Sequence, residues 1–218
     1  MISVVIPCYE MHGRGVEMLG ELLDSIDSQT FRDYEIVISD ADPSRDMIAM
    51  LAARGLWPAA GREGAAANFN RAIAFSVGRI IKPMFQDDKF IEPDSLQKIA
   101  DALEHASWVV CTSHNDGEEG FRKYDHVPYI HSTLAALRQG ENTYGSPSAV
   151  AWRRNELRMD ENLAWLFDCE FYARMVERYG CPTFVDTPIY IRQWSGQATH
   201  SLSHQRVVDT NYVIEKYR

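Results

Sequence analysis

The first half of the chain alternates short apolar segments with segments whose apolar residues recur at helical spacing. The apolar runs at residues 3–7 and 34–39 have the length of buried strands, and residues 16–26 between them carry apolar side chains three and four positions apart. The same alternation continues along the first half. Residues 46–53, 65–77 and 93–103 read as helices, and residues 79–85 and 108–112 read as strands. Such alternation predicts an α/β fold with a mostly parallel central sheet flanked by helices on both faces.

The second half is less regular. Residues 113–126 are polar and contain glycine, which is typical of a loop or a lid. We expect strands at 148–152, 183–186 and 189–192, a helix at 163–179 ended by Gly180, and a closing helix at 204–217. Because no linker or internal repeat interrupts the chain, we predict a single domain, 1–218, with a parallel half at 1–112 and a mixed half at 113–218.

The charge balance restricts the partners of this chain. It carries 31 acidic and 22 basic residues, a net charge of −9. An acidic chain without a basic stripe is unsuited to nucleic acid, and an anionic ligand would need a cation to accompany it. No apolar run is long enough for a transmembrane segment, and the N-terminus reads as a strand and not as a signal peptide, so we expect a cytoplasmic protein.

Two adjacent carboxylates, Asp87 and Asp88, follow the apolar strand at 79–85. Adjacent carboxylates repel each other, and a divalent cation relieves that repulsion. Hard oxygen ligands favour Mg²⁺ or Mn²⁺, with substrate phosphates completing the coordination. The alternative is a solvated turn in which an aspartate caps the next helix.

Other polar residues follow the first two strands. Ligands of open α/β sheets bind at the carboxyl ends of the strands, where Tyr9, Glu10 and Asp40 are expected. The Asp40 carboxylate could accept a hydrogen bond from a base N–H or a ribose hydroxyl. The alternative for Asp40 is an Asx turn that leads into the following helix.

Asn68 and Arg71 lie early in the helix predicted at 65–77 and share one face of it. An arginine near a helix start suits phosphate binding. A solvated helix face explains the same two residues equally well.

Asp168 is an acidic residue in an apolar stretch near a helix start. Apolar surroundings raise the pKa of a carboxyl group and make its ionised form a better general base. Glu170 is two positions away and cannot share its helix face, so we expect one of the two to pair with Arg174. The alternative is that both carboxylates only complement the helix dipole.

His200 and His204 are four positions apart and could reach one metal ion from a helix. Ser201 and Ser203 between them point instead to a helix cap. We keep His200 as a candidate additional metal ligand.

These features, in this order, resemble the family-2 glycosyltransferases, which have the GT-A fold. Residues 3–9, Ser-Val-Val-Ile-Pro-Cys-Tyr, are similar to the opening strand of that family. The stretch from Glu63 through Asn68 and Arg71 to Asp88 resembles the helix and metal motif of its glycan-synthesising branch. The run from Asp168 to Arg174 resembles the catalytic helix, whereas the final motif has Arg192-Gln-Trp194 without the usual histidine.

The resemblance implies an inverting transfer of a sugar from a nucleotide-sugar, a UDP-sugar by family likeness, to a glycan or other hydroxyl acceptor. Residues 1–112 would bind the nucleotide-sugar, and residues 113–218 would bind the acceptor and carry the catalytic base, Asp168. The metal, Mn²⁺ or Mg²⁺, would be held by Asp88, Asp87 and His200. The donor would contact Pro7, Tyr9, Glu10, Asp40, Asn68, Arg71 and Asp87.

Two other functions fit parts of the pattern. A sugar nucleotidyltransferase also joins a metal, a nucleotide and a sugar on an α/β sheet, but its glycine-rich basic phosphate loop is missing near this N-terminus. A non-catalytic sugar- or partner-binding domain of the same fold would account for the altered final motif. The retained Asp87, Asp88 and Asp168 argue against it.

Overall fold

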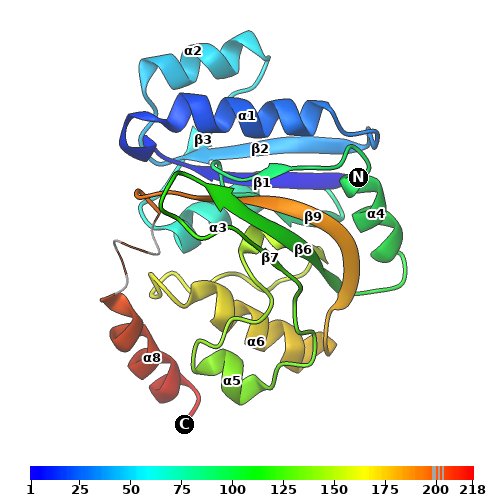
Figure 1. Ribbon diagram of the computed structural model, residues 1–218, viewed down its shortest axis with the longest axis vertical. Coiled ribbons are helices and arrows are strands. Elements are labelled where there is room, and N and C mark those ends of the chain that lie inside the picture. The colour runs from blue at the N-terminus through cyan, green and yellow to red at the C-terminus, as the bar shows by residue number, and fades with distance from the viewer. Residues whose placement is uncertain (198–199, 201, 203) are drawn as a thin grey trace.

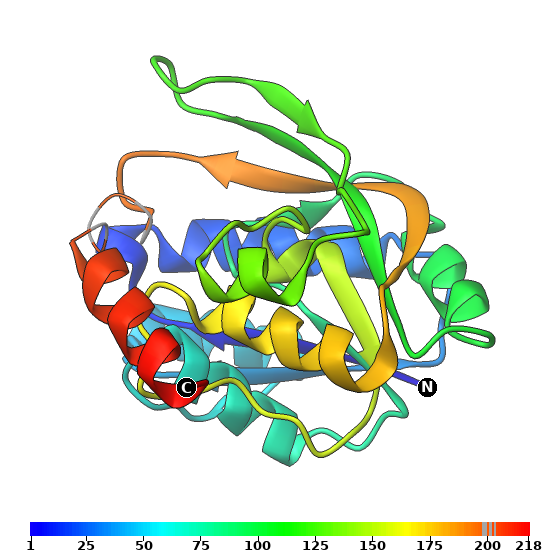
Figure 2. The ribbon, with the colours of Figure 1, turned by 90° about the horizontal axis from the view of Figure 1, so that it is seen from below.

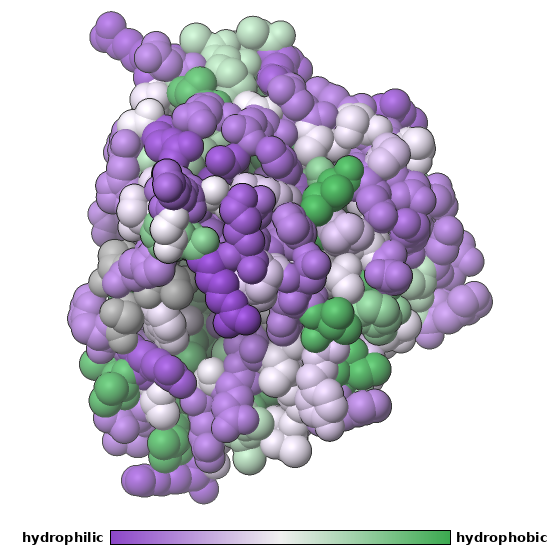
Figure 3. Space-filling view, in the orientation of Figure 1, coloured by the Kyte–Doolittle hydropathy of each residue, from purple (hydrophilic) through white to green (hydrophobic). Residues whose placement is uncertain are grey.

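The computed structural model describes residues 1–197, 200, 202 and 204–218 as a single mixed sheet covered by helices on both faces. The strands follow the order β3-β2-β1-β4-β8-β6-β9-β5, and β7 pairs with β6. No helix of the described residues is long and apolar enough to cross a membrane. The face seen in Figure 3 is mostly hydrophilic, with its hydrophobic residues in small separate patches.

The first half forms the predicted parallel sheet. Its strands are β1 (Ile2–Cys8), β2 (Tyr34–Asp40), β3 (Ala59–Ala60) and β4 (Ile80–Pro83). β1 pairs in parallel with both β2 and β4, and β2 pairs in parallel with β3. Every residue of β1 is buried, as expected of a strand covered on both faces.

Alternate residues of β1 belong to two hydrophobic cores, one on each face of the sheet. Figure 1 shows the helices that cover the two faces. Val4 and Ile6 pack in the core shared with α1 (Gly15–Asp27), α2 (Arg45–Ala53) and α4 (Ser95–Ala102). Val5 packs in the core on the other face, which includes α3 (Ala65–Phe75) and α6 (Phe167–Tyr179). The period of two along a strand therefore divides the core between the two helical layers.

The second half mixes strand directions. β8 (Val150–Arg153) runs antiparallel to β4 and to β6 (Trp108–Gly117), and β5 (Lys89–Phe90) runs antiparallel to β9. Among the described pairings four are parallel and four antiparallel, so the parallel arrangement is confined largely to the first half. The two short strands expected at 183–186 and 189–192 are one strand, β9 (Thr183–Gln193), which pairs in parallel with β6 across an irregularity near Ser113.

The segment at 113–126, expected to be a loop or a lid, consists largely of two paired strands. β6 continues to Gly117 and turns back into β7 (Tyr124–His126), forming a hairpin that rises from the body of the molecule in Figure 2. Hydrogen bonds to β9 explain why this polar sequence is extended, because the two strands stay paired to Gly117 and Gln193. At Gly117 a Cβ atom would lie 2.0 Å from the Gln193 carbonyl oxygen, so only glycine fits this close approach.

Two further α-helices of the described residues, α5 (Leu134–Arg138) and α8 (Gln205–Lys216), lie beside α6 in both ribbon views. The short 3-10 helices η1 (Met11–Gly13) and η2 (Pro147–Ala149) precede α1 and β8. The predicted closing helix at 204–217 is α8. The helix predicted at 163–179 begins later, at Phe167. The backbone N–H groups of residues 164–166 donate to Asp209 of α8, and the Leu166 carbonyl oxygen accepts a hydrogen bond from the Glu170 N–H of α6.

Candidate active site

Three parallel strands bring the candidate residues of the first half to one edge of the sheet. β1 ends at Cys8, which lies opposite Asp40 at the end of β2. β4 runs parallel to β1 and leads into residues 84–88. The predicted site residues of three chain segments therefore lie at the carboxyl ends of neighbouring strands, where open α/β sheets bind ligands.

Asp40 has a free hydrogen-bond acceptor in a buried place. Its side chain is 1% exposed, and its Oδ1 accepts a hydrogen bond of 3.1 Å from the backbone N–H of Asp42, which is an Asx turn. Its Oδ2 has no hydrogen-bond partner within the described residues. Burial, in the first place, raises the pKa of the Asp40 carboxyl. An unsatisfied buried oxygen of this kind suits a ligand N–H or hydroxyl donor.

Asn68 connects the same strand ends. Its amide nitrogen donates to the carbonyl oxygens of Cys8 and Ser39, both at 3.0 Å. Its amide oxygen accepts from the Ser39 hydroxyl at 2.5 Å and from the backbone N–H of Arg62 at 3.2 Å. The side chain is thus fully engaged in holding β1, β2 and the segment before α3 together.

The turn after β1 has an unusual backbone conformation. Met11 and His12 both have positive φ angles, 54° and 53°, which are uncommon for residues other than glycine. A Cβ atom at Gly15 would lie 2.9 Å from the carbonyl oxygens of Tyr9 and Glu10. Strained turns of this kind are concentrated at functional sites.

The turn is joined to the carboxylate pair through Tyr9. Its backbone N–H donates to the Gln86 side chain at 2.7 Å. Burial, followed by the charges of Asp87 and Glu10, raises the pKa of the Tyr9 hydroxyl, so the Asp87 carboxylate lies within electrostatic reach of that hydroxyl. Pro7 is buried within β1, and Glu10 is exposed.

Asp87 and Asp88 occupy different surroundings. Asp88 is buried, and its Oδ1 accepts a hydrogen bond of 3.1 Å from the backbone N–H of Arg192. Burial and then the charge of Asp87 raise the pKa of Asp88 well above its usual range. Asp87 is partly exposed and accepts a hydrogen bond of 2.9 Å from the indole N–H of Trp194.

A buried lysine, Lys82, lies in β4, the strand that leads to the carboxylate pair. The ammonium group of Lys82 donates to the carbonyl oxygens of Pro83 and Ser148. Burial lowers its pKa to about 8, an effect that the neighbouring Cys111 and Asp88 oppose. Sequence reasoning missed this residue. Its signal was a lysine in the middle of an apolar strand.

The carboxylate pair fits a divalent cation in its chemistry. Two neighbouring carboxylates, one buried, carry repulsion that a cation relieves, and Mg²⁺ is commonly held by one or two carboxylates together with waters and substrate phosphates. Within the described part of the chain, no group of three or more His, Cys, Asp or Glu residues could hold a metal ion.

His200 is exposed, and its ring lies 5.3 Å from the ring of Phe121. The two serines expected to cap a helix beside it, Ser201 and Ser203, are outside the described residues. The assignment of His200 as a metal ligand stays a prediction.

Arg71 does not contact the carboxylate pair. Its Nε donates to the Ala60 carbonyl oxygen at 3.3 Å, and its guanidinium lies 4.5 Å from the centre of the Phe75 ring. It lines a surface hollow together with Arg62 and Arg158. Its predicted contact with the donor stays a prediction.

Asp168 lies in the first turn of α6 and is partly exposed. Burial raises the pKa of its carboxyl group to about 6, although the backbone N–H of Cys169 and the Asn142 side chain both donate to it, at 2.7 and 2.8 Å. The raised pKa agrees with the expectation for a carboxyl group in an apolar stretch. A pKa near neutrality suits a general base. Asn142 comes from a segment that sequence reasoning did not connect with this residue.

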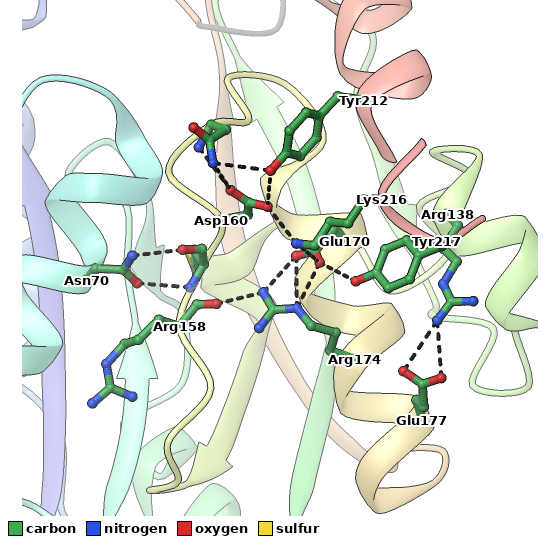
Figure 4. A network of polar contacts seen from close by, with 12 residues as sticks. Asn70, Arg138, Arg158, Asp160, Glu170, Arg174, Glu177, Tyr212, Lys216 and Tyr217 are labelled. Atoms are coloured by element: carbon green, nitrogen blue, oxygen red, sulfur yellow. Dashed lines mark hydrogen bonds and ion pairs between the residues drawn. The ribbon is translucent and has the colours of Figure 1, made fainter. Parts of the chain in front are cut away.

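Glu170 has a structural role, and the expected pairing with Arg174 is confirmed. The two residues share hydrogen bonds of 2.7–3.0 Å, and Lys216 and Tyr217 of the C-terminal segment also donate to Glu170 (Figure 4). Burial opposes the charge of Glu170, but these hydrogen bonds together lower its pKa. The network fastens the C-terminal segment to α6.

A carboxylate of α8 supports the start of α6. Oδ2 of the buried Asp209 accepts hydrogen bonds of 2.6–3.0 Å from three successive backbone N–H groups, those of residues 164, 165 and 166. These groups belong to the turn that precedes Asp168. No sequence signal connected Asp209 with this turn, because 43 residues separate it from Leu166.

Similar folds occur in solved glycosyltransferases. TarS residues 1–349 from S. aureus, in complex with UDP-GlcNAc, matches with a TM-score of 0.67 and 16% identity over 92% of this chain and 60% of that chain. The mannosyltransferase PcManGT from Pyrobaculum calidifontis, in complex with GDP-Man and Mn²⁺, matches with a TM-score of 0.66 and 16% identity over 99% of this chain and 64% of that chain. The chain therefore spans less than two thirds of the length of either structure. These likenesses confirm the predicted GT-A fold.

Sequence comparison places the chain more specifically. No curated protein matches it significantly. The model of the family described as glycosyl transferase family 2 matches residues 3–160, which is most of the chain. The chain belongs to glycosyl transferase family 2.

Proposed function

We propose that this protein is an inverting glycosyltransferase that moves a sugar from a UDP-sugar to a hydroxyl group of a glycan or other acceptor. The observation that carries the proposal is the Asp168 carboxyl, partly exposed and with its pKa raised to about 6 by burial. A carboxylate with this pKa is mostly ionised at pH 7 and accepts a proton more readily than an ordinary aspartate.

The reaction follows from one base and one leaving group. Asp168 accepts the proton of the acceptor hydroxyl as its oxygen forms a bond to C1 of the donor sugar. The bond from C1 to the diphosphate oxygen breaks, and its electron pair leaves with the nucleoside diphosphate. The attack comes from the face opposite the leaving group, so the configuration at C1 inverts.

The carboxyl ends of β1 and β2 form the donor site in this proposal. The free Oδ2 of Asp40 accepts a hydrogen bond from the uracil or the ribose, and Tyr9 packs beside the nucleotide. Asn68 holds the strand ends in place. Pro7 near the end of β1 and Glu10 in the turn after it lie at the same strand end. The contact of Arg71 with the donor stays a prediction from the sequence.

Asp87 and Asp88 would hold Mn²⁺ or Mg²⁺, with His200 as the candidate third ligand, and the ion would supply Lewis-acid stabilisation of the diphosphate charge. Mn²⁺ is present in the complex of the mannosyltransferase of similar fold. Asp87 also remains a candidate for contact with the ribose. We infer a cytoplasmic location, in keeping with the sequence expectation.

The test is donor turnover. The protein is incubated with a panel of UDP- and GDP-sugars, with and without Mn²⁺, and the release of nucleoside diphosphate is measured. We expect release from one UDP-sugar, dependent on the cation and lost in Asp88→Ala. The absence of both release and nucleotide binding across the panel would leave the non-catalytic function instead.

A further inference from the structure

A surface hollow of about 400 Å³ lies between α3 and the segment that leads from β8 to α6. Its lining includes three arginines, Arg62, Arg71 and Arg158, and one carboxylate, Glu161. Three cations and one anion give the lining a net charge of +2, in a chain whose net charge is −9. The volume falls in the range of small-molecule sites, about 300–1,000 Å³.

The two walls of the hollow are fixed to each other. Asn70 of α3 accepts a hydrogen bond of 2.9 Å from the Met159 N–H and donates one of 2.8 Å to the Met159 carbonyl oxygen. Its amide nitrogen also donates to Glu161 at 3.0 Å, and Glu161 pairs with Arg62 at 2.9 Å. Because these contacts cross from α3 to the opposite segment, the hollow is formed in the absence of a ligand.

The guanidinium groups are anchored while part of each stays available. One terminal nitrogen of Arg158 donates to the carbonyl oxygens of Asn155 and Leu157 at 2.9 and 2.8 Å, whereas Arg71 uses its Nε toward Ala60. Among the described residues, the two terminal nitrogens of Arg71 have no hydrogen-bond partner. The second terminal nitrogen of Arg158 has none either, and neither arginine forms an ion pair. In Figure 4 the Arg158 guanidinium extends away from the Glu170 network, on the side of Asn70.

A further arginine adds positive charge nearby. Arg154 donates to the Gly78 carbonyl oxygen and the Ser76 hydroxyl, both at 2.6 Å. Its pKa is lowered by burial and then by the charge of Arg158, which shows that the two cations lie within electrostatic reach. A bound anion would relieve this crowding of like charges.

We propose that the hollow lined by Arg62, Arg71 and Arg158 is a binding site for a phosphate group carried by a molecule other than the nucleotide-sugar. Phosphate matches the forked guanidinium donors better than a single carboxylate does, and it accepts from two arginines at once. The inference does not depend on the proposed transfer reaction. In this inference the donor diphosphate binds at the carboxyl ends of the strands. Arg71 binds the second phosphate-carrying molecule, and not the nucleotide-sugar that the sequence resemblance indicates.

The test uses inorganic pyrophosphate as the probe, titrated calorimetrically into the full chain at low salt with a chelator present to remove divalent cations. Arg71→Gln and Arg158→Gln are compared with Arg178→Gln, which removes the same charge from the exposed end of α6. We expect binding to weaken at least fivefold in each of the first two variants and to be unchanged in the third. Their melting temperatures verify that all three are folded.

A second titration distinguishes the source of the phosphate. Pyrophosphate is titrated into protein saturated with UDP, and UDP binding is measured in each variant. We expect both ligands to bind together and UDP affinity to be unaffected by Arg158→Gln. Equal pyrophosphate affinity in all variants would overturn the proposed site. If UDP displaces pyrophosphate, and the arginine variants lose affinity for both ligands, the arginines bind the donor diphosphate instead. Neither result depends on whether a sugar is transferred.

Discussion

The carboxylate of Asp209 accepts a hydrogen bond of 3.0 Å from the backbone N–H of Leu166, the residue two positions before Asp168. Two further bonds, from residues 164 and 165, converge on the same oxygen. Helix α8 therefore holds the turn that immediately precedes the proposed catalytic base. A base is effective only where its geometry is maintained, so the contribution of α8 to the site is positional.

Asp209→Ala should destabilise the protein by about 3 kcal/mol, because it removes an ionised acceptor and leaves three N–H groups without it. Urea denaturation measures this loss. Glu215→Ala is the matched control, since it removes an exposed carboxylate from the same helix and should change stability by less than about 0.5 kcal/mol. Equal stability of the two variants would contradict the role assigned to Asp209.

Glu170 should matter far more to stability than Glu177, although both lie on α6 and both pair with an arginine. Glu170→Gln leaves Arg174 and Lys216 without their buried carboxylate and should cost about 3–5 kcal/mol. Glu177→Gln breaks an exposed pair with Arg138 and should cost no more than about 1 kcal/mol. Thermal unfolding of the two variants at pH 7 measures the difference. Similar losses of unfolding free energy would show that the network in Figure 4 stabilises the protein no more than an exposed ion pair does.

The pH dependence of transfer should report Asp168. The base works only when ionised, so with a pKa of about 6 the turnover rate should be constant above pH 7 and fall about tenfold per unit below pH 6. Asp168→Asn should bind UDP as the wild type does but lose most of its turnover. Turnover that stays level down to pH 4.5, or an Asn variant of full activity, would remove Asp168 from the mechanism.

The local sequence pattern was enough to predict much of the candidate site. Asp40, Asp87 and Asp88 could be placed because each follows an apolar strand, and parallel strands bring such positions to one edge of the sheet. The pairing of Glu170 with Arg174 followed from their i, i+4 spacing on a helix. Both inferences need only neighbouring residues and the period of the element that carries them.

What could not be predicted depends on contacts between distant segments. Trp194 donates to Asp87 across 107 positions, and no periodicity relates those residues. The polar run after residue 112 is a strand because β9 pairs with it, which overrides a loop-like composition. Lys82 contradicts the apolar pattern around it and is tolerated only because carbonyl oxygens of Pro83 and Ser148 surround its ammonium group.

Asp40→Asn separates ligand binding from stability. The Asn side chain can still accept from the Asp42 N–H through one oxygen, while an NH₂ group replaces the acceptor that has no partner. The free energy of unfolding should therefore stay within about 1 kcal/mol of the wild type. UDP affinity, measured by calorimetry, should fall about tenfold, because a ligand donor would face another donor. Arg32→Gln on the exposed surface serves as the control for a change of one charge. Unchanged UDP affinity in Asp40→Asn would mean that the free oxygen at the end of β2 does not contact the nucleotide.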